Sequence, residues 1–78
     1  MPGRGAIMGI LFDYSMLVKA ITVAGGVPRV STAAGMKPDA LRRSLKNKRE
    51  FTIQEMNDLC AVLHISSKHI PKYFYKRA

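Results

Sequence analysis

The chain has 78 residues, and its 13 lysines and arginines against five acidic residues give a net charge of +8 at pH 7. This length allows at most one small domain, the single cysteine excludes a disulfide within the chain, and Cys60, His64 and His69 lack the spacing of a zinc site. The charge indicates an anionic partner, with nucleic acid first and an acidic membrane surface second.

Residues 1–9 are expected to form a flexible N-terminal extension, followed by a single domain over residues 10–78. The apolar run 6–12 is too short to span a bilayer, and Asp13 interrupts it at once. No small-residue cleavage site follows that run, and a lone cysteine suits a reducing compartment. The sequence therefore predicts a cytoplasmic protein without a membrane segment.

Apolar residues recur every three or four positions along most of the chain, which is the helical period. A first helix is predicted to begin at Asp13, whose carboxylate can accept from free backbone amides, and to end at Gly25. A second, short helix is predicted over residues 27–34. Pro28 suits the first turn of that helix, where a missing amide has no cost, and Gly35 ends it.

A third helix is predicted over residues 38–46, in which Leu41 and Leu45 are spaced to face the core. The clearest local signal follows a short loop. Thr52 and Glu55 form the pattern of a capping box in front of an apolar periodic run, which predicts the start of a fourth helix.

One more helical turn is predicted in the C-terminal part of the chain. Ser66 or Ser67 is the candidate N-cap of this turn, and Pro71 is expected to end it. Cys60 lies on the apolar face of the fourth helix, so we interpret it as a packing residue. Phe74, in a tail that alternates aromatic and basic residues, is expected to fold back on the core. With about five short helices and no convincing strand, the sequence predicts an all-α fold, a compact helical bundle.

The second and third predicted helices, joined at a glycine, have the sequence form of a helix-turn-helix. Val30 can be buried between them, Ser31 is small enough for a close contact, and Gly35 allows the positive backbone angle of the turn. The stretch VSTAAGMKPDALRRSLKN, which starts at Val30, resembles the helix-turn-helix of small phage repressors of the lambda-repressor/Cro (XRE-like) type. The continuation KNKREFTIQEM and the closing ISxxxIxxYF resemble a group of such proteins from phages and prophages of Gram-positive bacteria, over residues 10–75 in all.

This resemblance implies a sequence-specific DNA-binding regulator of a phage or prophage switch, acting in the cytoplasm of a bacterial host. In proteins of this type the outward face of the second helix, here 38–46, enters the major groove. Arg42 and Arg43 are then the candidate guanine readers, because a guanidinium can donate to both O6 and N7. Asp39 can either accept from a cytosine amine or stabilise the dipole of the helix.

Further basic residues on the second helix, at the edges of the third and in the loop behind it are candidate phosphate ligands: Arg29, Lys37, Lys46, Lys48 and Arg49. The expected partner is a double-stranded DNA operator. Whether the chain also forms a homodimer is left open by the sequence. The sequence has no nucleophile with a base, no carboxylate pair and no phosphate loop, so neither an enzyme nor a cofactor is expected. Some small phage proteins of this kind resemble antirepressors, so the alternative is a protein that binds the DNA-reading face of a phage repressor.

Overall fold

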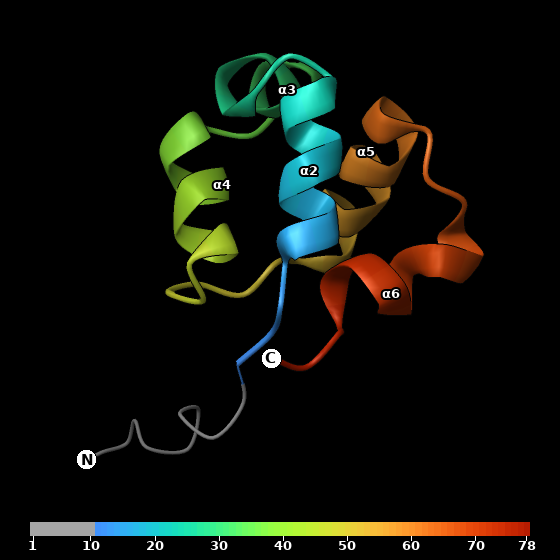
Figure 1. Cartoon of the computed structure of the whole chain (residues 1–78). Coiled ribbons are helices and arrows are strands. Elements are labelled where there is room, and N and C mark those ends of the chain that lie inside the picture. The colour runs from blue at the N-terminus through green and yellow to red at the C-terminus, as the bar shows by residue number, and fades with distance from the viewer. Residues whose placement is uncertain (1–10) are drawn as a thin grey trace.

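The computed structural model describes residues 11–78, so the prediction of a flexible extension over residues 1–9 lies outside the described part. Residues 11–78 form five α-helices and a 3-10 turn: α2 (Ser15–Val23), α3 (Val27–Ala33), α4 (Pro38–Leu45), α5 (Ile53–Leu63), η1 (Ser67–His69) and α6 (Ile70–Phe74). Helix α2 stands in the middle, between α4 on one side and α5 and α6 on the other, and α3 lies near its C-terminal end (Figure 1). The prediction of an all-α bundle is confirmed.

One cluster of buried side chains from all five helices forms the core. Leu17 of α2, Leu41 of α4 and Leu59 of α5 are completely buried at its centre. Burying a leucine contributes roughly 1.5–3 kcal/mol, so each of these three side chains adds substantially to the stability of so small a fold. Cys60 and Phe74 are buried as well, which confirms that both pack in the core.

A chain of aromatic contacts connects the N-terminal segment with the C-terminal helix. Phe12 contacts Tyr14 and Tyr75, Tyr14 contacts Phe51, and Phe51 contacts Phe74, with ring centroids 5.2 to 6.1 Å apart. Three of these four contacts are edge-to-face, the arrangement that the charge distribution of aromatic rings favours. The segment before α2 is thereby fixed to α6 and to the loop before α5.

The helix starts bear out some local predictions and correct others. Thr52 and Glu55 form the predicted capping box: the Thr52 Oγ1 accepts from the Glu55 N–H at 3.0 Å, and a Glu55 carboxylate oxygen accepts from the Thr52 N–H at 2.9 Å. Helix α2 begins at Ser15 rather than at Asp13, although the Asp13 carboxylate still accepts from the Ser15 N–H at 2.9 Å. The expectation that Pro71 ends the last turn is wrong. Pro71 lies in the first turn of α6, where its missing amide is harmless, and the helix runs on.

None of the helices in residues 11–78 has the length and apolar character needed to cross a membrane.

Candidate nucleic-acid interface

Helices α3 and α4 pack against each other across a tight turn at Gly35. This glycine has a φ of 74°, which L-residues with side chains rarely adopt. The next amide, that of Met36, donates to the Ser31 carbonyl oxygen at 2.8 Å and closes the end of α3. Ser31 is completely buried and its hydroxyl donates to the Pro28 carbonyl oxygen at 3.1 Å, so this buried hydroxyl has a hydrogen-bond partner. This turn fixes the angle at which α4 leaves α3.

One side of α4 faces the core and the other faces solvent. Leu41 and Ser44 are completely buried, while Leu45 packs against the core with part of its surface exposed. The sequence predicted Leu41 and Leu45 as the inward pair and missed Ser44. The predicted reading residues Asp39, Arg42 and Arg43 all lie on the exposed side.

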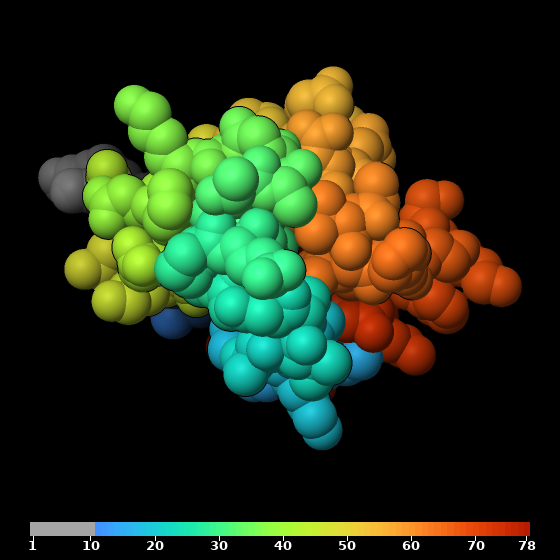
Figure 2. Space-filling model, turned by 90° about the horizontal axis from the view of Figure 1, so that it is seen from above, coloured from blue at the N-terminus to red at the C-terminus, as the bar shows by residue number. Residues whose placement is uncertain are grey.

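The solvent-facing side of α4 and its flanks carry a high positive charge. Among the predicted phosphate ligands, four are exposed, one on α3 and three at the two ends of α4: Arg29, Lys37, Lys46 and Lys48. Within residues 11–78 the ion pairs are Arg49 with Glu55 and Lys76 with Asp13, so none of these four, nor Arg42 or Arg43, is neutralised by a carboxylate of the described chain. Figure 2 shows α4 and the following loop on one side of the molecule, away from α6 and the tail.

Arg49, also predicted as a phosphate ligand, has its guanidinium bound within the chain. Its Nη1 donates to the Ser44 Oγ at 2.8 Å and to the Glu55 Oε1 at 2.9 Å, and its Nη2 donates to the Glu55 Oε2 at 2.6 Å. The hydrogen bonds between Arg49 and Glu55 are the main cause that raises the pKa of Arg49 and lowers the pKa of Glu55. The structure therefore makes Arg49 a link between α4 and α5.

The loop after α4 contains Asn47, whose role the sequence analysis missed. Its φ is 60°, and the chain around it closes the helix: the Asn47 N–H donates to the Ser44 carbonyl oxygen at 3.0 Å and the Lys48 N–H to that of Arg43 at 2.9 Å. Its side chain binds the backbone of Phe12 twice, with Oδ1 accepting from the N–H and Nδ2 donating to the carbonyl oxygen, both at 3.0 Å. An asparagine directly after a helix was the available signal, because asparagine tolerates the left-handed conformation.

The backbone segment that Asn47 binds is held from its other side as well. Residues 11–13 pair antiparallel with the tail 76–78 through two backbone hydrogen bonds of 2.6 and 3.0 Å. The Lys76 ammonium also lies 3.6 Å from the Asp13 carboxylate. The loop after α4 is thus attached to both ends of the described chain.

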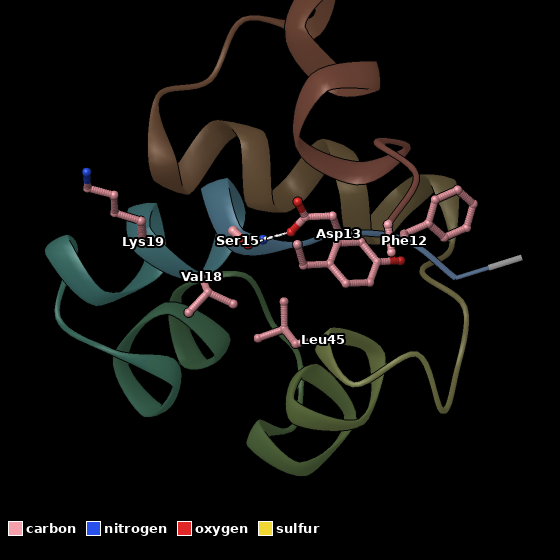
Figure 3. A pocket seen from close by; sticks show the side chains of 8 residues that line it. Phe12, Asp13, Ser15, Val18, Lys19 and Leu45 are labelled. Atoms are coloured by element: carbon pink, nitrogen blue, oxygen red, sulfur yellow. Dashed lines mark hydrogen bonds between the residues drawn. The ribbon is translucent and has the colours of Figure 1, made fainter.

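An open hollow lies between α2 and α4. It is lined by residues of the N-terminal segment, α2, α4 and the tail: Phe12, Asp13, Tyr14, Ser15, Val18, Lys19, Leu45 and Ala78. In Figure 3, Val18 and Leu45 extend into it from α2 and α4, while the Lys19 ammonium points away. Asp13 lines the hollow, and its carboxylate accepts from the Ser15 hydroxyl, which is the main cause that lowers the pKa of Asp13. The charged group beside that carboxylate is the Lys76 ammonium, and the rest of the lining is mainly apolar.

The other reactive groups of the described chain are dispersed. Burial raises the pKa of the Cys60 thiol, which makes it less reactive. No cluster of three or more His, Cys, Asp and Glu side chains that could hold a metal ion occurs in residues 11–78. The exposed side of α4 with its flanks is therefore the feature with the most evident binding chemistry.

Comparison of the chain with models of known protein families, with curated proteins and with solved structures finds no match.

Proposed function

We propose that the chain is a sequence-specific DNA-binding protein whose helix α4 enters the major groove, and that it regulates transcription in a phage or prophage switch. One observation carries the proposal. Helix α4 buries Leu41 and Ser44 in the core while Arg42 and Arg43 extend outward without a carboxylate partner in residues 11–78. A helix held firmly by one side and presenting arginines on the other suits major-groove reading, which needs both rigidity and bidentate donors.

In this proposal the exposed residues of α4 read the bases. Arg42 and Arg43 each donate to O6 and N7 of a guanine. Asp39 lies in the first turn of α4, where its carboxylate is stabilised by the dipole of the helix and can accept from a cytosine amine. These three residues supply the sequence preference.

The flanking cations bind phosphates and set the position of α4 on the duplex. Lys37 precedes the first turn of α4, Lys46 follows its last turn and Lys48 lies in the loop beyond, so their charges bracket the helix. Arg29 adds a fourth charge from the exposed side of α3. Phosphate contacts of this kind give affinity and salt dependence but carry no sequence information.

Selection of tight-binding duplexes from a random library tests the proposal, with the double variant R42A/R43A as the matched control. We expect the chain to enrich one motif and the control to enrich none while still binding random duplexes at low salt. Failure of the chain to bind any duplex at low salt would contradict the proposal. Capture of a phage repressor by such a chain would then favour the antirepressor alternative.

A further inference from the structure

We propose that Asn47 is a positioning residue of the DNA-binding surface: its side-chain amide clasps the backbone of Phe12 and so fixes the loop that carries Lys46 and Lys48 for phosphate binding. This inference rests on the DNA-binding function proposed above and adds to it a residue that does not itself touch DNA.

Ending the helix does not by itself require an asparagine. Helices α2 and α3 are followed by Gly25 and Gly35, both with positive φ, because glycine adopts this conformation without steric cost. Asn47 occupies the same position after α4 with a φ of 60°, at a conformational cost that glycine would avoid. What it gains over glycine is the side chain that binds Phe12.

The clasp joins residues 35 positions apart through two hydrogen bonds of 3.0 Å. The Asn47 side-chain amide pairs with both the N–H and the carbonyl oxygen of Phe12, as a residue of a neighbouring β-strand would. Both hydrogen bonds are partly buried, and Phe12 is itself held by Tyr14, Tyr75 and the paired tail. Asn47 is therefore attached to a rigid support.

Because of the position of Asn47 in the chain, its hydrogen bonds to Phe12 can affect phosphate binding. Asn47 stands between Lys46 and Lys48, two of the four exposed cations of the proposed phosphate contacts. The amides of these lysines donate to the carbonyl oxygens of Arg42 and Arg43, so the loop is continuous with the reading residues. Because the backbone of this loop is already fixed, the loop loses less conformational entropy when its two lysines bind phosphates.

The variant N47G isolates the clasp, since glycine keeps the helix end and removes the side chain. We expect its affinity for both the selected operator and a random duplex to fall about fivefold to tenfold. The slope of log affinity against log salt should decrease by about one to two, because up to two phosphate contacts weaken, while the ratio of operator to random binding stays unchanged. N47S leaves the side chain neutral between Lys46 and Lys48 but can keep at most one of the two hydrogen bonds to Phe12, so its affinity should lie between those of N47G and the parent chain.

The matched control is H64G, which changes the other non-glycine residue with positive φ in residues 11–78, at the end of α5 and outside the proposed interface. Its affinity and salt slope should equal those of the parent chain. All titrations are made at a temperature at which circular dichroism shows every variant fully folded, so that a loss of stability alone cannot change the slope.

An unchanged affinity and salt slope in folded N47G would overturn the inference. So would a loss confined to the operator with an unchanged slope, since α4 itself would then have moved. If N47G does not fold, the affinity and the salt slope of the neutral variant N47S decide. A parent chain that binds no duplex refutes the proposed function, and the positioning role with it, and this outcome is distinct from the failure of N47G alone.

Discussion

Arg49 and Glu55 form a two-bond ion pair that ties the loop after α4 to the first turn of α5, with N···O distances of 2.9 and 2.6 Å. The same guanidinium donates to the buried Ser44, and the same carboxylate accepts from the Thr52 N–H. One charged pair therefore satisfies a polar group inside α4 and completes the cap of α5.

From this pair we predict that R49A lowers the free energy of unfolding by about 1 kcal/mol, since Glu55 loses its ion pair and the buried Ser44 hydroxyl loses its hydrogen-bond donor. R49K should recover only part of the loss, because an ammonium cannot bind both carboxylate oxygens in the same plane. Urea titration measures both. K48A is the neighbouring control: it should leave stability unchanged and weaken DNA binding. A stable R49A protein with a reduced salt slope for DNA would mean that Arg49 binds phosphate after all.

The pair also predicts how stability depends on pH. The hydrogen bonds from Arg49 lower the pKa of Glu55 in the folded chain below its usual value near 4.5. The charged Glu55 carboxylate therefore contributes its full stabilisation above pH 4.5, the usual pKa. This stabilisation is lost as the pH falls through the lower pKa of the folded state.

The variant E55Q isolates this charge, because a glutamine can still complete the capping box. E55Q should be less stable than the parent chain at pH 7, and the difference should shrink as the pH falls below about 4.5. Urea titrations between pH 3 and pH 7 measure it. Asp13, whose pKa is also lowered, is present in both proteins and cancels in the comparison. A difference that stays constant over this range would exclude a role for the charge.

The cap of α5 makes a separate prediction. T52A should destabilise the chain by about 1 kcal/mol, since the Glu55 N–H loses its acceptor, whereas T52S should be close to the parent chain. Thermal unfolding of the two variants side by side measures the effect. Equal melting temperatures would show that water replaces the threonine hydroxyl without cost.

The register of α4 can be tested through stability alone. L41A should cost about 2–5 kcal/mol, because Leu41 is completely buried, and in a domain of this size that is a large part of the total. R42A should barely change the melting temperature, since Arg42 is exposed. The reverse order in calorimetry would contradict the assignment of inward and outward sides.

The features that the sequence predicted correctly are local. The capping box of Thr52 and Glu55 is written within four residues, and the burial of Leu41 follows from the helical period. The missed features depend on residues brought together by folding. Phe12 and Asn47 are 35 positions apart, and no local pattern shows that one side chain will meet the other backbone.

The same limit applies to charge. Arg49 stands in a run of cations and was counted among them, but the loop folds so that its guanidinium reaches Glu55 in the next helix. Ser44 is a small polar residue between two basic ones and a leucine, and its burial depends on the partner that Arg49 supplies. Arg42 and Arg43 were placed correctly on the exposed side of the helix because helix geometry alone decides it.

The most direct test of DNA reading by α4 compares R42A and R43A with K48A on the selected operator and on a random duplex, over a series of salt concentrations. We predict that each arginine variant loses about 1–3 kcal/mol on the operator and much less on the random duplex. K48A should weaken both duplexes equally and lower the salt slope by about one. If the three variants instead reduce operator and random binding to the same extent, α4 contributes charge alone and does not read the sequence.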